Sequence, residues 1–266
     1  MRPRSPWFAL SVCLSSGAVC RDVSPAGRKM TTRESRTDMP DARKPSKEEI
    51  LALLKSHLSK WNMNMARIGA LLLGLDALPA SLIREAPEIR DDILRAAVVF
   101  LHATLEEFLR TVASFLLPQA SEETLNTIPL LGSRDLLRPE KFFLGRLIHH
   151  RGRTVDEVIE GSVREHLLRV SFNDPGDVKR LLHSCGIATE LIDGVLPAIG
   201  EMMARRHQIV HQADIPPWSV APAPIDRADV AKWQKAVEDV ALSVTAVRVV
   251  DAFSKTRVED PHNDAS

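Results

Sequence analysis

The residues best suited to chemistry lie together in the short segment RRHQIVH, from Arg205 to His211. Arg206 supplies a permanent cation whose planar fork of donors suits the oxygens of a phosphate or a carboxylate. His207 and His211 supply imidazoles, which exchange protons in the physiological pH range and also bind metals. A spacing of four residues places the two imidazoles about 40° apart on a helix. The segment therefore carries the groups for proton transfer, anion binding or metal binding.

Arg206 falls in an otherwise apolar face if its segment is helical. On a wheel of about 100° per residue it lies about 20° from Ile199. Within about 60° of Ile199, the same face carries Ile192, Val195, Leu196, Met203 and Val210. A guanidinium keeps its proton and is costly to bury unpaired, so an anion must meet it. The sequence leaves two such anions open. One is a bound phosphate, and the other is the carboxylate of Glu106 or Glu107, with which Arg206 would form a structural ion pair.

The two histidines also have the spacing of helical metal ligands, with Asp214 as a third candidate. No glutamate lies between them, as it does in H-E-x-x-H zinc sites, and no further cluster of His or Cys is evident. Metal binding is therefore an alternative to proton transfer, and the leading expectation is a site without metal or cofactor.

The elements that must position these residues are all predicted to be helices. Their starts and ends carry the signals of capping residues, prolines and glycines. The first predicted helix begins near Lys47, after the capping box Ser46/Glu49, and the second spans Asp92–Leu117. The third follows the capping box Thr154/Glu157, and the fourth runs from Asp174 and Pro175 to Leu182. The fifth spans Thr189–His211, and the sixth begins at Asp226. Pro197 either kinks the fifth of these helices or starts its second half. Because no alternating strand pattern, repeat or glycine-rich phosphate loop is present, the sequence predicts an all-α helical bundle.

Composition limits where a polyanion could bind. Of the 266 residues, 44 % are hydrophobic and 26 % are charged, which is typical of a globular protein with a sizeable core. The 35 basic and 35 acidic residues balance, so any nucleic-acid site must be local. Three cysteines, Cys13, Cys20 and Cys185, make neither a disulfide framework nor a zinc ligand set, which favours a cytoplasmic location.

The chain is predicted to hold one structured domain. The apolar run Trp7–Val19 follows two arginines and loosely resembles a secretory signal, but Met30 and Met39 offer later starts, and an over-extended start is favoured. No run approaches the ~18 apolar residues of a membrane span. We expect a disordered leader, a helical domain and a polar tail over residues 1–45, 46–254 and 255–266 respectively.

The segment Arg206–His211, R-H-Q-I-V-H, resembles the R-x4–6-H signature of HEPN domains, and His207 fills the polar position directly after the arginine. Ile209, Val210 and Asp214 resemble the I-V-H-x-x-D form of the RiboL-PSP-HEPN branch.

Two longer segments extend this resemblance over most of residues 90 to 215. RAAVVFLHATLEEFLR, Arg95–Arg110, is similar to the early core helix of that branch, and Thr154–Gly186 is similar to its middle section. The N-terminal 45 residues and the last helix resemble nothing specific.

The resemblance implies a homodimer in which the arginine and histidine of both protomers line one cleft. RNA is cut there without a metal, leaving a cyclic phosphate and a 5′-hydroxyl. The residues suit this reaction, because attack by a 2′-hydroxyl needs a base, an acid and fixed positive charge. Arg206 and His211 lie about 140° apart on a helix, so two helices related by a two-fold axis would aim them together more easily than one.

The resulting hypothesis assigns acid–base chemistry to His211, phosphate stabilisation to Arg206 and an orienting or second polar role to His207. Glu106, Glu107 and Asp214 are supporting candidates. The chain would be a toxin or defence nuclease acting on RNA, with an antitoxin or regulatory protein as candidate partner. The alternative is a non-catalytic HEPN module that binds a partner protein or a nucleotide.

Two other features have simpler interpretations. The basic patch HHRGR, from His149 to Arg153, is predicted to be a solvated loop rather than an RNA-binding surface. Trp61, Trp218 and Trp233 are predicted to anchor the core or loops, because stacking platforms for bases need a basic groove that the sequence does not reveal.

Overall fold

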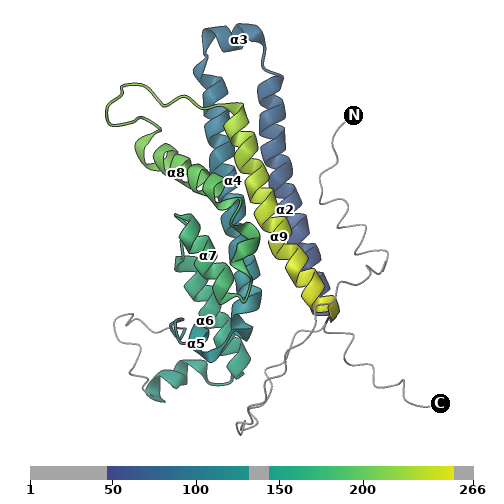
Figure 1. Ribbon diagram of the computed structural model, residues 1–266. Coiled ribbons are helices and arrows are strands. Elements are labelled where there is room, and N and C mark those ends of the chain that lie inside the picture. The colour runs from purple at the N-terminus through teal and green to yellow at the C-terminus, as the bar shows by residue number, and fades with distance from the viewer. Residues whose placement is uncertain (1–46, 132–143, 255–266) are drawn as a thin grey trace, which may run out of the picture. The chain divides into compact units, whose positions relative to one another are not determined.

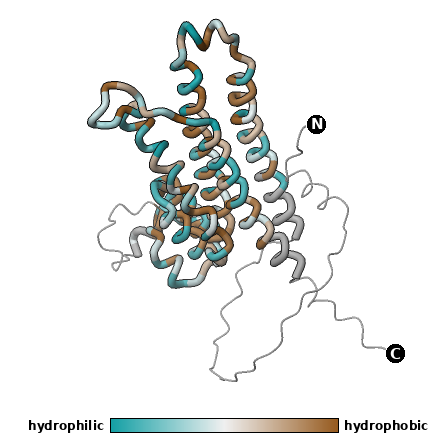
Figure 2. Tube along the Cα trace, turned by 45° about the horizontal axis from the view of Figure 1, so that its top comes forward, coloured by the Kyte–Doolittle hydropathy of each residue, from teal (hydrophilic) through white to brown (hydrophobic). Residues whose placement is uncertain are grey.

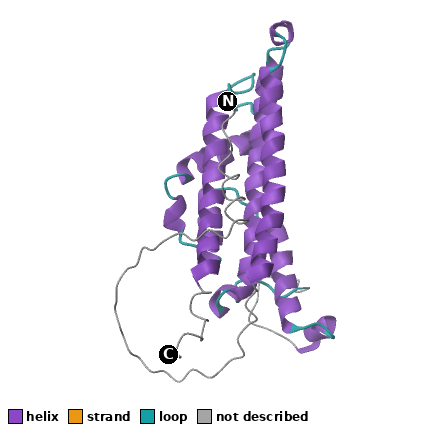
Figure 3. Ribbon diagram, turned by 90° about the vertical axis from the view of Figure 1, so that its right-hand side faces the viewer, coloured by secondary structure: helices purple, strands orange, loops and turns teal. Residues whose placement is uncertain are grey.

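The computed structural model describes residues 47–131 and 144–254, which belong to one compact unit. Within these ranges the chain forms helices joined by loops and turns, without strands (Figure 3). The all-α prediction is therefore confirmed. The predicted leader, the capping residue Ser46 and the C-terminal tail lie outside the described residues.

The predicted helical segments occur in the predicted order. The α-helices of the described ranges are α2 (Lys47–Asp76), α3 (Ala80–Glu85), α4 (Glu88–Leu116), α5 (Glu122–Leu125), α6 (Val155–Arg169), α7 (Pro175–Ser184), α8 (Leu196–Gln212) and α9 (Arg227–Ser254). Short 3-10 helices are η1 (Leu117–Gln119), η2 (Leu144–His150) and η3 (Thr189–Ile192). The shorter elements α3, α5, η1 and η2 were not predicted. No helix in the described parts of the chain is long and apolar enough to cross a membrane.

Helix α4 is the central element of the bundle. It contacts α2, α6, α7, α8 and α9, and it runs alongside the long helices α2 and α9 (Figure 1). Its buried side chains recur at helical spacing and include Leu94, Ala97, Val98, Leu101, Leu105 and Leu109. Burial of one such leucine is worth about 1.5–3 kcal/mol. Figure 2 shows apolar and polar residues alternating along the helices, as expected for helices that share a core.

Several helix starts are fixed by the side chains that the sequence indicates. Thr154 accepts a hydrogen bond from the backbone of Glu157, and the Glu157 carboxylate accepts one from the backbone N–H of Thr154. Asp174 and Asp177 form the same reciprocal capping box at α7, where Pro175 occupies the first turn. Such caps satisfy backbone donors that a helix start leaves unpaired.

The predicted helix Thr189–His211 is instead two elements. Residues Thr189–Ile192 form η3, and α8 begins at Leu196 with Pro197 in its first turn. Proline is tolerated there because the first helical N–H groups have no intrahelical acceptor. Pro197 thus starts a helix and does not kink one.

Candidate functional site

Helix α8 carries Arg206, His207 and His211, and it lies obliquely against α4 (Figure 1). Its first turns bury Ile199, Met202 and Met203. These apolar side chains fix the rotation of α8 about its axis, and so decide which of the motif residues face the bundle.

The covered side of α8 changes along its length. In the last turns Arg205 and Ile209 are partly covered, whereas Val210 is 47 % exposed. The prediction that Val210 belongs to the core-facing stripe is therefore wrong. The loop that follows α8 is bonded to the Arg205 side of the helix, as described below.

His207 and His211 lie on the exposed side of α8, one turn apart. Their ring centroids are 4.7 Å apart and the ring planes are tilted by 48°. Neither imidazole has a hydrogen bond to a described residue. Both rings are therefore accessible to a ligand from solvent.

Arg206 is half-buried, and its guanidinium makes no hydrogen bond or ion pair with any described residue. The two carboxylates proposed from the sequence are occupied elsewhere. Glu106 Oε2 lies 3.5 Å from Nη1 of Arg110, and Glu107 Oε1 lies 3.6 Å from Nζ of Lys60 on α2. The structural ion pair considered for Arg206 is not formed with either of them.

The charge of Arg206 acts on the buried imidazole of His102 on α4. Burial lowers the pKa of His102, the charge of Glu106 raises it, and the charges of Arg206 and Arg110 lower it. Nε2 of His102 donates a hydrogen bond to the carbonyl oxygen of Phe172 at 3.0 Å. The lowered pKa of His102 favours its neutral form. Arg206 is therefore a cation without a counter-ion among the described residues.

Asp214 forms a buried ion cluster that the sequence analysis did not find. Its side chain is 0 % exposed, and Oδ2 accepts hydrogen bonds from Nε of Arg95 and Nη2 of Arg205, each at 2.7 Å. Both arginines also donate to the carbonyl oxygen of Ala223, at 2.8 and 2.9 Å. Asp214 therefore holds α4, α8 and the following loop together, and it cannot serve as a third ligand beside the two histidines.

The end of α8 depends on the same cluster. Ala213 and Asp214 have φ values of 49° and 59°, so the chain leaves the helix through two left-handed residues. The backbone N–H of Ala223 then donates to the carbonyl oxygen of Asp214 at 2.8 Å. The loop between these residues is thus closed at its base, directly after the turn that carries His211.

The tryptophans have different environments. Trp61 and Trp233 are buried, as predicted for core anchors. Trp218, at the outer part of the loop after α8, is 88 % exposed, so its predicted anchoring role is wrong. In the basic patch, His149 and His150 end the 3-10 helix η2, and His150 is buried, so the predicted loop is wrong for these two residues. Arg151 and Arg153 follow in a turn and are exposed, as predicted.

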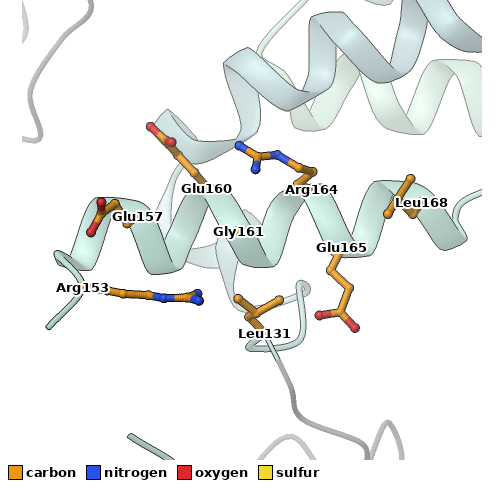
Figure 4. A pocket seen from close by; sticks show the side chains of 8 residues that line it. All are labelled: Leu131, Arg153, Glu157, Glu160, Gly161, Arg164, Glu165 and Leu168. Atoms are coloured by element: carbon orange, nitrogen blue, oxygen red, sulfur yellow. The ribbon is translucent and has the colours of Figure 1, made fainter. Parts of the chain in front are cut away.

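A pocket of about 490 Å³ lies along α6 (Figure 4). Leu131, Gly161 and Leu168 give it apolar walls, and its charged lining residues are Arg153, Arg164, Glu157, Glu160 and Glu165. Three carboxylates against two guanidinium groups make it a poor site for a phosphate. None of its lining residues belongs to α8.

The described ranges hold no group of three or more His, Cys, Asp or Glu side chains that could bind a metal ion. Comparisons with protein-family models, curated proteins and solved structures found no match to this chain.

Proposed function

We propose that this chain is a metal-independent endoribonuclease of the HEPN type that cleaves RNA with Arg206 and His211 of two α8 helices. The observation that carries the proposal is the environment of Arg206. Its guanidinium is half-buried on the helix of the exposed histidine pair and has no anion among the described residues. A cation in such a place is suited to bind an anionic ligand, and arginine matches phosphate oxygens in geometry.

In the proposed reaction a base removes the proton of an RNA 2′-hydroxyl. The 2′-oxygen attacks the adjacent phosphorus, the bond to the 5′-oxygen breaks, and an acid protonates that leaving oxygen. The products are a 2′,3′-cyclic phosphate and a 5′-hydroxyl. His211 transfers protons, His207 orients the substrate or supplies a second polar group, and Arg206 neutralises charge on the phosphorane.

Glu106, Glu107 and Asp214 act outside this chemistry. Asp214 holds the end of α8 by binding Arg95 and Arg205. Glu106 accepts hydrogen bonds from Arg110 and from the backbone N–H of Phe172, which joins α4 to the segment before α7. Glu107 faces Lys60 at the surface.

His211→Ala tests the proposal. We expect cleavage of single-stranded RNA to fall by ~100- to 10,000-fold, the usual contribution of a general acid–base group. The melting temperature should hardly change, because the imidazole is exposed. His183→Ala removes an exposed histidine of α7 and is the matched control, with unchanged cleavage.

The outcome separates the proposed metal-independent mechanism, a metal-dependent reaction and a non-catalytic module. The proposed mechanism requires that EDTA leave the wild-type rate unchanged and that the products carry cyclic phosphate. Cleavage that survives His211→Ala would contradict the assignment of His211. If the purified wild-type chain cuts no RNA, the non-catalytic module that binds a protein or nucleotide is the better account.

A further inference from the structure

The exposed histidine pair has the geometry of a two-ligand metal site. His207 and His211 occupy successive turns of α8, with ring centroids 4.7 Å apart. A Zn²⁺ ion with bonds of about 2.0–2.1 Å to two imidazole nitrogens requires those nitrogens to lie about 3 Å apart. Both side chains are solvent-exposed, so the surrounding residues leave room for the rings to rotate towards each other.

The surroundings of the pair also favour a cation. Helix α8 ends at Gln212, so His211 lies in its last turn, where the helix dipole attracts positive charge. No hydrogen bond to a described residue competes for the ring nitrogens. Arg206 is partly buried, whereas both histidines of the pair are exposed.

The identity of the ligands determines which ions fit. Two neutral imidazoles prefer Zn²⁺, Cu²⁺ or Ni²⁺ over Mg²⁺ and Ca²⁺, which prefer oxygen ligands. Asp214 does not complete the site, because two arginines bind its buried carboxylate. An ion on the pair therefore has two protein ligands and further positions open to water or anions.

We infer that His207 and His211 chelate a late first-row divalent cation, and that the bound ion inhibits RNA cleavage by occupying the imidazoles that the reaction needs. The binding half stands on the geometry of the pair alone. The inhibitory half rests on the proposed function. Zinc is thus an inhibitor of this site and not its cofactor.

Calorimetric titration of the full chain with ZnCl₂, without RNA, tests the binding half. His207→Ala and His211→Ala should each weaken zinc affinity by roughly tenfold or more, since even groups outside the ligand shell change affinity on that scale. His183→Ala, which removes an exposed histidine outside the pair, should bind zinc as the wild type does. MgCl₂ should give no binding. Equal zinc affinity in the wild type and both pair variants would overturn the site.

Cleavage assays test the inhibitory half. Zinc should suppress cleavage by the wild type and by His183→Ala, and EDTA should restore it. Whatever cleavage His207→Ala retains should resist the same zinc concentration. If zinc accelerates wild-type cleavage, inhibition is overturned. If zinc binds the pair but the chain cuts no RNA, the metal site stands while the proposed function fails.

Discussion

Arg205 and Arg206 are neighbours in sequence but have opposite environments. Arg205 donates to buried Asp214 and to the carbonyl oxygens of Ala223 and Pro224. Arg206 has no such acceptor among the described residues, and its charge acts on buried His102. One arginine is thus suited to hold the fold and the other to bind a ligand.

Alanine variants of the two arginines should therefore fail in different ways. Arg205→Ala removes donors from Asp214 and two carbonyls, and should lower the free energy of unfolding by about 1–3 kcal/mol, the usual cost of stranding buried acceptors. Arg206→Ala should leave the free energy of unfolding nearly unchanged but abolish RNA cleavage. Urea denaturation and cleavage rates of both variants check this pair of outcomes. A folded, fully active Arg206→Ala protein would remove Arg206 from the mechanism.

His102 should make stability depend on pH. Its pKa is lowered in the folded state, mainly by burial, whereas the unfolded chain has the ordinary value of about 6.5. Below about pH 6.5 the unfolded state binds more protons, so stability falls as the pH falls towards the lowered folded pKa. Each pH unit by which that pKa is lowered corresponds to about 1.4 kcal/mol. Above about pH 6.5 His102 is neutral in both states, so it adds nothing to the pH dependence of the free energy of unfolding.

His102→Gln isolates this effect, because glutamine can still donate to the carbonyl oxygen of Phe172 but does not titrate. Denaturation between pH 5 and 7.5 should show a shallower loss of stability in the variant than in the wild type. Some loss should remain, since burial also lowers the pKa of His166. His183→Gln, at an exposed position, should retain the wild-type slope. An identical slope in His102→Gln would show that His102 does not titrate in this window.

At the scale of elements, the C-terminal end of α8 combines strain with close packing. Ala213 adopts φ 49° as the C-cap, a conformation that costs a residue with a Cβ roughly 1–2 kcal/mol. The following loop is closed on Asp214, which is bound by arginines of α4 and α8. The turn that carries His211 is therefore held in place by contacts between residues that are far apart in the sequence.

Ala213→Gly should relieve that strain. We expect stabilisation by roughly 0.5–1 kcal/mol, offset in part by the greater flexibility of glycine in the unfolded chain. Ala204→Gly, at an exposed position within α8, should instead destabilise by about 1 kcal/mol. Thermal melts of the two variants should shift in opposite directions. Destabilisation of the same size in both would mean that the left-handed cap carries no strain.

How far the sequence predicted these elements depends on the range of the interactions that build them. The caps of α6 and α7 join residues three apart, and the stripe of α4 repeats along one helix, so both could be read from local spacing. The Asp214 cluster joins α4 to a residue 119 positions later, and no local pattern encodes that distance. Periodicity also assigned Val210 to the core, because a helical wheel assumes that one face is covered along the whole helix, whereas Val210 is exposed in the last turns of α8.

For the whole molecule, the divergence of Arg206 and His211 predicts a two-fold dimer. Arg206 is half-buried, while His211 is exposed. One α8 therefore does not direct both side chains to one phosphorus atom, but the α8 helices of two protomers can. Light scattering at micromolar concentration should report a dimer. A monomer with full cleavage activity would contradict the shared site.

Heterodimers of differently substituted protomers test whether each site draws on both chains. A heterodimer of Arg206→Ala with His211→Ala contains one intact pair, the arginine of one protomer and the histidine of the other. If the site is shared, its cleavage rate should recover to about half that of the wild type, because one of two equivalent sites is complete. Each homodimeric variant should remain inactive. The matched control pairs a wild-type protomer with one that carries both substitutions, which leaves an arginine and a histidine only within the same chain. That control should be inactive if catalysis crosses the interface, whereas an active control beside an inactive mixed heterodimer would place each site within one protomer.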